Sequence, residues 1–293
     1  MTFLMLFFSC REQPTEEYRA PSLTQETETE SGFCDEPDIS QVPVGSVDCE
    51  NDICFVPGGS FWMGSSRAMD ECPAREVTLD DFYIDAKEVS NALWNDCVSS
   101  GGCTDTPQSC DPNRIGPSHD PPESLPVVCV TFPQANEYCE WAGGRLPTEA
   151  EWEKAARGTE GAIWAWGAIT PDCQAANFRL ATIHCYQDIS PVGYFEDIRS
   201  AYGLWDTNGN VFEWTSDFYD ADYYENAPDS NPTGPTSDCN LAYGEADQEC
   251  SDRVLRGGAY NTTEDVIRGS ARSFAPPELL DINIGLRCAY DQR

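Results

Sequence analysis

The chain has few basic residues, and this shortage argues against the first large class of partners. Its 293 residues include 17 Lys and Arg against 51 Asp and Glu, which gives a formal net charge of −34 at pH 7. Such an acidic surface repels a phosphate backbone, so we expect no nucleic-acid partner. The same charge favours solubility and the attraction of cations such as calcium.

Histidine is also scarce, and cysteine pairs at metal-binding spacing are missing. Only His119 and His184 are present, and no C-x-x-C occurs among the 15 cysteines. Zinc sites usually need paired ligands at short spacing, so zinc does not account for these cysteines. A reducing cytosol would leave them as thiols, whereas an oxidising compartment would join them. The cysteines therefore predict an exported protein held together by disulfide bridges.

A long apolar run is missing everywhere except at the N-terminus. Residues 1–10 form a short apolar segment that ends in Ser9 and Cys10, after which the chain becomes polar. This is the form of a bacterial lipoprotein signal, in which Cys10 becomes the acylated first residue. No Lys or Arg precedes the segment, so a secretory signal peptide cleaved nearby is the alternative. With Cys10 set aside, 14 of the 15 cysteines remain, enough for seven bridges.

These features predict where the protein is located. We expect it in the bacterial cell envelope, facing the periplasm or the exterior, with an N-terminal lipid anchor as its only contact with the membrane. A secreted protein is the alternative. Residues 11–51 are rich in Glu, Thr, Ser, Gln and Pro, a composition that predicts an acidic disordered tether. Such a tether would hold the domain away from the membrane.

Residues 52–293 have the composition of one α+β domain with little regular structure. Hydrophobic residues make up 40% of the whole chain, enough for a sizeable core. A turn and a short strand are predicted over 56–64, and another strand over 77–84. Helices are predicted near 90–98, from Thr131 to the pair Gly143 and Gly144, and from Thr148 to a stop at Gly158. Beyond Gly158 we expect mostly loops and short strands.

The segment from Asp206 to Glu213 carries four carboxylate or amide side chains around a tight turn at Asn208 and Gly209. Interleaved carboxylates, amides and exposed carbonyls are what a hard cation needs. It is not an EF-hand, because Val211 stands where that loop requires glycine. A calcium-binding loop and a plain polar turn both remain open.

Several blocks in order resemble the formylglycine-generating enzymes, or sulfatase-modifying factors. The resemblance covers roughly residues 52–291. The block over 125–153, which contains Gly-Gly-Arg-Leu-Pro-Thr-Glu-Ala-Glu-Trp-Glu, is the most specific. The others are FVPGGSFWMG at 55–64, YGLW to GNVFEW at 202–214, RVLRGGAY at 253–260 and GLRCA at 285–289.

The resemblance implies a fold distantly related to the C-type lectin domain, poor in regular secondary structure and stabilised by disulfides and calcium. One implied calcium site takes the side chains of Asp206 and Glu213 with the carbonyls of Gly209 and Val211. A second takes Asn177 and Phe178, with Asp188 as a weaker candidate. The resemblance also implies a disulfide between Cys139 and Cys288.

The enzymes of this family oxidise a substrate cysteine to formylglycine with copper(I) held by two cysteine thiolates, soft ligands for a soft ion. Here the interval from Gly258 to Arg272 contains no cysteine, and Thr262 stands at the place of the first ligand. Ala259 replaces a serine of the family. Copper is therefore not expected, and the catalytic residues of the family are absent.

Our leading hypothesis is a pseudoenzyme that keeps a groove and binds a peptide or another extracytoplasmic ligand. By the same resemblance, the groove residues are Tyr260, Asn261, Thr262, Glu264 and Arg268. Arg272 and Arg287 are interpreted as partners of buried carboxylates. The alternatives are an oxidoreductase that still generates formylglycine or performs related sulfur oxidation, and a structural envelope lipoprotein without a ligand.

Overall fold

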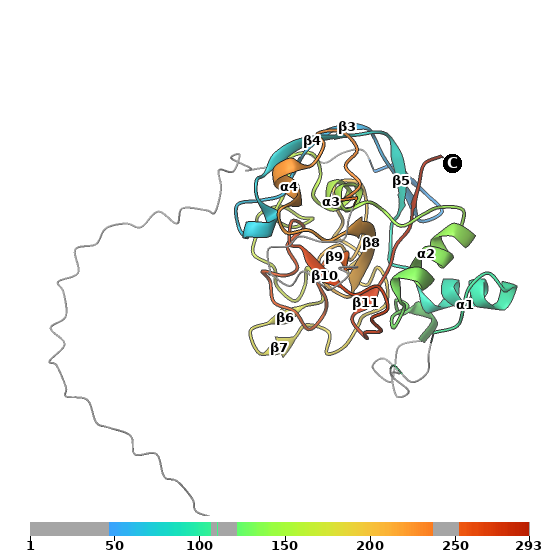
Figure 1. Ribbon diagram of the computed structural model, residues 1–293. Coiled ribbons are helices and arrows are strands. Elements are labelled where there is room, and N and C mark those ends of the chain that lie inside the picture. Colours follow the sequence, from blue (N-terminus) through green and yellow to red (C-terminus); the bar gives the residue numbers. More distant parts are fainter. Residues whose placement is uncertain (1–46, 107–109, 111–121, 237–251, 293) are drawn as a thin grey trace, which may run out of the picture. The chain divides into compact units, whose positions relative to one another are not determined.

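The computed structural model describes residues 47–106, 110, 122–236 and 252–292 (Figure 1). The predicted signal segment with Cys10, nearly all of the predicted tether and His119 lie outside these residues. Residues 47–51, which the sequence analysis assigned to the end of the tether, contribute the first strand of a sheet. None of the described helices is long and apolar enough to cross a membrane.

Two four-stranded sheets and two ribbons contain the strands. The first sheet has the order β1 (Cys49–Glu50), β2 (Ile53–Val56), β5 (Phe82–Asp85) and β12 (Ala289–Tyr290). The second has the order β10 (Ser273–Ala275), β9 (Arg253–Arg256), β8 (Phe212–Phe218) and β11 (Ile284–Gly285). The ribbons are β3 (Gly59–Met63) with β4 (Arg75–Leu79), and β6 (Arg179–Leu180) with β7 (Ile183–His184). The first sheet therefore joins the two ends of the domain, because β12 pairs with β5.

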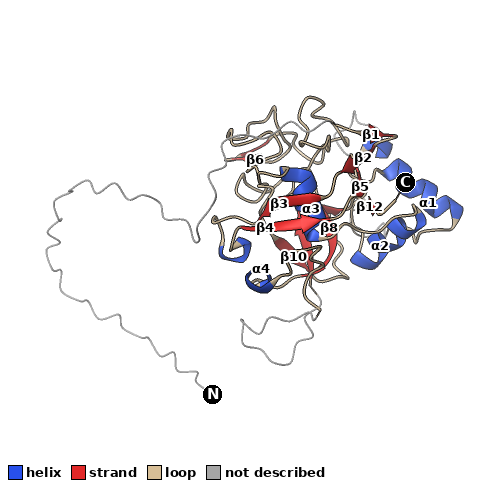
Figure 2. Ribbon diagram, turned by 90° about the horizontal axis from the view of Figure 1, so that it is seen from above, coloured by secondary structure: helices blue, strands red, loops and turns tan. Residues whose placement is uncertain are grey.

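The first three of the described helices begin where the sequence predicts, and the last was not predicted. The described helices are α1 (Asn91–Ser100), α2 (Phe132–Trp141), α3 (Glu149–Arg157) and the short α4 (Tyr223–Asn226), with single turns of 3-10 helix at Met69–Glu71 and Pro122–Ser124. Thr131 and Thr148 each form a capping box with the residue three positions later. Figures 1 and 2 show α1 and α2 side by side, away from α3.

The prediction of a single strand over 77–84 is wrong. The chain forms two strands there, β4 and β5, which belong to different sheets. Between them, Asp81 accepts a hydrogen bond from the backbone N–H of Gly58, and the backbone N–H of Asp80 donates to Asn231. The two aspartates thus lie in a connection between the strands, which the alternating pattern did not indicate.

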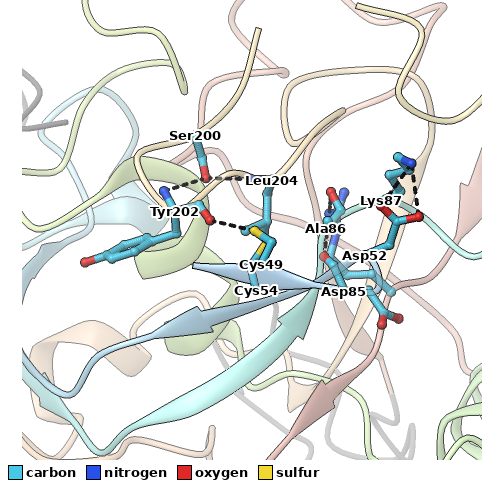
Figure 3. Close-up of a disulfide and its surroundings, with 10 residues drawn as sticks. Cys49, Asp52, Cys54, Asp85, Ala86, Lys87, Ser200, Tyr202 and Leu204 are labelled. Atoms are coloured by element: carbon cyan, nitrogen blue, oxygen red, sulfur yellow. Dashed lines mark hydrogen bonds and ion pairs between the residues drawn. A yellow bond between two sulfur atoms is a disulfide. The ribbon is translucent and has the colours of Figure 1, made fainter. Parts of the chain in front are cut away.

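Disulfides hold the edges of this domain together. Cys49 is bonded to Cys54 across β1 and β2, beside Tyr202 and Leu204 (Figure 3). Cys139 of α2 is bonded to Cys288, the pair that the resemblance implies, across 149 residues of sequence. Both cysteines are fully buried in the core that packs α1 and α2 against the second sheet. This bridge therefore anchors the last strand to the helical side of the domain.

Candidate functional site

Helix α3 lies in the interior and carries charge there. All nine of its residues are buried, including Glu149, Glu153, Lys154 and Arg157. Trp152 of the same helix is 1% exposed. Burial of this kind is unfavourable for charged groups unless each has a partner. The surrounding loops and β9 supply those partners.

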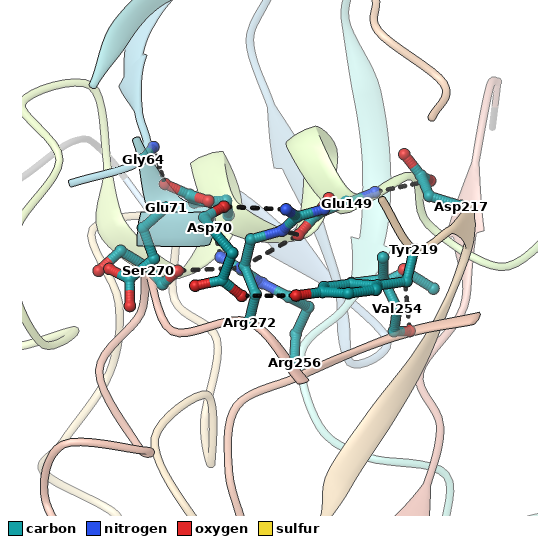
Figure 4. A network of polar contacts seen from close by, with 12 residues as sticks. Gly64, Asp70, Glu71, Glu149, Asp217, Tyr219, Val254, Arg256, Ser270 and Arg272 are labelled. Carbon is teal, nitrogen blue, oxygen red and sulfur yellow. Dashed lines mark hydrogen bonds and ion pairs between the residues drawn. The ribbon is translucent and has the colours of Figure 1, made fainter. Parts of the chain in front are cut away.

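A continuous network of ion pairs surrounds α3 (Figure 4). Glu149 accepts two hydrogen bonds from Arg272, at 2.7 and 3.0 Å. Arg256 lies between the two glutamates, 2.7 Å from a carboxylate oxygen of Glu153 and 3.2 Å from one of Glu149. Arg157 pairs with Glu153 one helical turn away. Arg256, Glu149 and Glu153 are at most 1% exposed.

Ser270 connects this network to a further ion pair, because its carbonyl accepts from Arg256 at 3.1 Å and its hydroxyl from Arg268 at 3.0 Å. Arg268 forms a two-pronged pair with Glu71, with N–O distances of 2.6 and 2.7 Å. Burial alone would raise the pKa of Glu71, but the hydrogen bonds and charge of Arg268 outweigh it, so the pKa is lowered. Three carboxylates therefore face four guanidinium groups in one buried network. Arg268, which the sequence analysis placed beside a groove, is one of these buried partners.

A second buried cluster has the opposite balance. Glu213 of β8 accepts hydrogen bonds from Arg287 at 2.6 and 2.7 Å and from the indole N–H of Trp152 at 2.6 Å. Asp206 and Glu88 lie in the same cluster, and no guanidinium forms an ion pair with either among the described residues. Asp206 accepts from the backbone N–H of Gly193 at 2.5 Å.

The pKa values in this cluster reflect that imbalance. Burial, opposed by the hydrogen bond from Gly193 and the charge of Arg287, raises the pKa of Asp206 to about 6. Burial also raises the pKa of Glu88 well above its usual range, and the negative charges of Asp206 and Glu213 add to the effect. Glu88 was not identified from the sequence, because it precedes α1 and lies 118 residues before Asp206 without a recognisable motif.

The residues expected to bind calcium fit a cation only in part. Both carboxylate oxygens of Glu213 are taken by Arg287. Asn177 donates its amide hydrogens to the carbonyl of Asp188 and the side chain of Asn210, which leaves its buried oxygen Oδ1 without a hydrogen bond. An orphaned buried oxygen is a suitable ligand for a hard cation.

The other donors are less available. The carbonyl of Phe178 accepts from the backbone N–H of Cys185. Within the residues described, no group of three or more His, Cys, Asp or Glu side chains is arranged to hold a metal ion.

The interval from Gly258 to Arg272, which contains no cysteine, begins with a tight turn. Gly258 has φ of +75°, and a β-carbon there would lie 2.7 Å from the side chain of Ile267. The hydroxyl of Thr262 bonds to the backbone N–H and the carbonyl of Ala259, at 3.0 and 2.8 Å. Tyr260 is 9% exposed, with its ring centroid 5.8 Å from that of His184. Asn261 and Glu264 are half-buried.

Two open pockets in the described part of the chain lie outside this interval. One, of about 600 Å³, is lined by Asp80, Asp81, Arg145 and Asp291 among others. The other, of about 640 Å³, is lined by residues 172–175 and 194–198. Neither is lined by any of the five predicted groove residues.

The cysteines of the described residues are all disulfide-bonded. Besides the two bridges above, Cys97 is joined to Cys103, Cys110 to Cys129 and Cys173 to Cys185, and Cys72 is also bonded. The described part of the chain therefore offers no thiol for metal binding or redox chemistry. Disulfide bonding is the role that the sequence analysis gave these cysteines.

The sparse sheets, the capped interior helix and the arginine network define an α+β domain of the formylglycine-generating-enzyme type. The chain belongs to the family described as sulfatase-modifying factor enzyme 1-like domain, whose model matches residues 39–292. It is 32% identical to a formylglycine-generating enzyme of Streptomyces coelicolor over 290 residues, which cover 80% of this chain and 88% of the relative.

Two further relatives have other names. The hercynine oxygenase of Mycolicibacterium smegmatis is 30% identical over 85% of this chain and 64% of its own length. The structure of PvdO from Pseudomonas aeruginosa is similar, with a TM-score of 0.65 and 26% identity over 86% of this chain and all of PvdO. Because these relatives bear different names, family membership alone does not fix the reaction.

Proposed function

We propose that this chain is a non-catalytic member of its family, a lipid-anchored module that binds a peptide or another ligand outside the cytoplasm. One observation carries the proposal. The interval from Gly258 to Arg272, where the family's enzymes hold copper(I), contains no cysteine. Thr262, at the place of the first ligand, uses its hydroxyl within its own turn. A neutral hydroxyl and nearby carboxylates are hard ligands, which do not replace a pair of thiolates on copper(I).

The contacts that hold the domain together support a fold that is kept without oxidation of a substrate cysteine. Of the ion-paired residues around α3 and the disulfide-bonded cysteines, only Arg268 and Arg272 lie in the interval from Gly258 to Arg272, and Thr262, at the place of the first copper ligand, belongs to neither group. A stable scaffold that has lost its reactive groups can still bind ligands, because fold and function are separable.

The test compares this protein with the formylglycine-generating enzyme of Streptomyces coelicolor under identical conditions. The full mature chain is loaded with copper, and copper content and oxygen-dependent conversion of a cysteine-containing sulfatase peptide are measured. We expect no bound copper and no aldehyde product from this chain, but both from the relative. Turnover with stoichiometric copper would overturn the proposal in favour of the oxidoreductase. If the chain binds nothing on peptide and glycan arrays, the proposed ligand binding is wrong and a structural role is favoured.

The anchor has a separate test. Lipidation at Cys10 predicts that radiolabelled fatty acid is incorporated into the protein in a bacterial host, and that Cys10→Ser abolishes the label and releases the protein from membranes. Unlabelled wild-type protein in the culture medium would favour the secreted alternative.

We also propose that calcium stabilises the domain. The support is the orphaned oxygen of Asn177 and the buried excess of carboxylate around Asp206. Asp206 and the carbonyls of Gly209 and Val211 would hold one ion, while Asn177 and Phe178 would contribute to another. Glu213 is committed to Arg287, so we do not expect it to coordinate unless that pair opens.

A further inference from the structure

The pocket of about 640 Å³ differs from the rest of the acidic surface because aromatic rings lie beside its carboxylates. One wall consists of residues 172–175 and the other of residues 194–198. Asp172, Glu196, Asp197 and Tyr194 are exposed on its lining, and Phe195 beside them is half-buried. We call this the aromatic–acidic pocket.

The first wall is fixed by covalent and hydrogen bonds. The side chain of Asp172 accepts from the backbone N–H of Gln174 at 2.8 Å, and its carbonyl accepts from Ala175 at 3.0 Å. Cys173 is bonded to Cys185, which directly precedes Tyr186. The disulfide therefore ties this wall to the aromatic residues beside the pocket.

The second wall presents an ordered set of rings. Tyr194 lies between two others, with ring centroids 4.7 Å from Tyr186 and 5.2 Å from Phe195, both edge to face. Its own side chain is 51% exposed, although a large aromatic side chain usually gains from burial. The turn that carries it is closed by a hydrogen bond from its own backbone N–H to the carbonyl of Pro191 at 3.1 Å, and the next turn is closed by one from the N–H of Ile198 to the carbonyl of Phe195 at 2.9 Å. The rings are thus held in place before any ligand arrives.

The charge of the pocket is of one sign. Its lining contains three carboxylates and no Lys, Arg or His. None of the three forms an ion pair within the described residues. Arg199, which follows the second wall, lies instead over the ring of Trp205, with its guanidinium carbon 3.9 Å from the ring centroid. Its Nε also donates to the backbone carbonyl of Glu196 at 3.3 Å, but among the described residues Arg199 forms no ion pair with the three carboxylates.

Carboxylates beside aromatic rings select one class of cation. A hard metal ion requires six to eight oxygen ligands and gains nothing from a ring. An organic cation is attracted to the electron-rich ring face as well as to the carboxylates, and its apolar part can cover the exposed tyrosine.

We propose that the aromatic–acidic pocket binds an organic cation, namely an ammonium or guanidinium group of the kind carried by lysine, arginine or choline. This inference rests on the proposed binding function and gives it a ligand class and a place.

The test is calorimetric titration of the full mature chain with four probes. Two are the end-blocked tripeptides acetyl-Gly-Lys-Gly-amide and acetyl-Gly-Arg-Gly-amide, the third is choline, and the uncharged acetyl-Gly-Gln-Gly-amide is the control. We expect the cationic probes to bind and the glutamine peptide not to bind. Binding should weaken as salt rises, because the carboxylates are exposed. Preference for the tripeptides over choline would identify a peptide ligand, and the reverse a small molecule.

Three variants locate the site. Tyr194→Ala should weaken binding about tenfold, whereas Tyr194→Phe, which keeps the ring, should stay within about twofold of wild type. Asp80→Asn is the matched control, because it lies in the acidic pocket of about 600 Å³ that has no aromatic side chain in its lining. We expect it to leave binding unchanged. Both positions are at the surface, so an unchanged melting temperature verifies the fold of each variant.

Two results would overturn the inference. One is equal binding of the lysine and glutamine peptides, and the other is equal loss of affinity in Tyr194→Ala and Asp80→Asn. These failures are separable from that of the proposed function. Peptide binding elsewhere, unaffected by Tyr194→Ala, would remove the aromatic–acidic pocket but keep the binding module. Formylglycine production would remove the non-catalytic proposal and leave the titration of the pocket as an independent result.

Discussion

The two buried clusters of charge use the same residue types in different proportions. Around α3, Glu71, Glu149 and Glu153 face four arginines, and each carboxylate has at least one guanidinium partner within 2.7 Å. Around β8, by contrast, three carboxylates, Glu88, Asp206 and Glu213, lie near a single arginine. Among the described residues, that arginine, Arg287, forms an ion pair only with Glu213. Lys87 lies nearer the surface and pairs with Asp52.

This difference in the ratio of carboxylates to arginines distinguishes a structural network from a candidate binding site. A buried network in which every charge is paired holds elements together, and its groups keep their charge. In a buried cluster with more carboxylates than cations the ionised form is disfavoured, and burial accordingly raises the pKa values of Asp206 and Glu88. The α3 network is therefore interpreted as structural, and the β8 cluster as a place where a cation would be stabilised.

Removing one arginine from the balanced network should have the largest effect. Arg256→Met keeps an unbranched side chain of similar length but leaves Glu149 and Glu153 with one partner each. We expect a loss of about 3–5 kcal/mol in the free energy of unfolding, measured by chemical denaturation at pH 7, because buried carboxylates lose a charge partner.

Arg145→Ala is the matched control for that experiment. Arg145 also forms a two-pronged pair, with Glu151, but its side chain is 35% exposed. Its removal should cost about 1 kcal/mol. Adding Glu153→Gln to Arg256→Met should restore part of the lost stability, because one buried charge is removed. Equal losses in the two single variants would mean that burial of the network does not decide its contribution.

Calcium should have an intermediate effect, specific to the other cluster. With calcium at 100 times its dissociation constant, the free energy of unfolding should rise by about 2.7 kcal/mol for one site. Thermal melting with calcium and with a chelator measures this rise, and elemental analysis counts the bound ions. Asp206→Ala and Asn177→Ala assign the sites, while Arg256→Met should keep the calcium response. An unchanged melting temperature and no bound calcium would contradict the prediction.

The sequence predicted local structure and family better than it predicted partners. The capping boxes at Thr131 and Thr148 are encoded within four residues, so their helices could be located directly. The ion pairs of Arg268 with Glu71 and of Arg287 with Glu213 span 197 and 74 residues. No local pattern encodes such a pair. Arg287 was assigned a buried carboxylate partner in general terms, whereas Arg268 was placed beside a groove by the family resemblance, which does not show its distant partner Glu71.

The aromatic–acidic pocket also depends on contacts that no local sequence pattern encodes. Its walls come from two loops in the region beyond Gly158, where the sequence analysis expected only loops and short strands. Tyr186 and Tyr194 are eight residues apart, and only the folded chain with its Cys173–Cys185 bridge brings the two rings together. A pattern of aromatic and acidic residues in a loop has no fixed period, so sequence periodicity could not reveal it.

The smallest expected effect concerns Asp217, a buried carboxyl at the edge of the balanced network that has no guanidinium partner among the described residues. Its oxygen Oδ2 accepts from the backbone N–H of Glu149 at 2.9 Å and from Ser216 at 3.1 Å (Figure 4). Burial, with the negative charges of Glu149 and Glu151, raises its pKa to about 7, although both hydrogen bonds oppose the rise. Tyr223 is close enough for the carboxylate charge to raise the pKa of that phenol in turn.

The sign of the resulting pH dependence follows from linkage. Between about pH 4 and pH 7 the folded protein keeps the Asp217 proton that the unfolded chain has already released, so stability falls as pH rises and the full penalty is present above pH 7. Asp217→Asn removes this penalty. Since each pH unit between the two pKa values costs about 1.4 kcal/mol, we expect little gain over wild type at pH 4 and a gain of about 2 kcal/mol in the free energy of unfolding at about pH 5.5. Asp96→Asn, exposed on α1, should show no such trend. A gain that is equal at both pH values would mean that Asp217 is ionised throughout, and that the network around α3 tolerates an unpaired carboxylate.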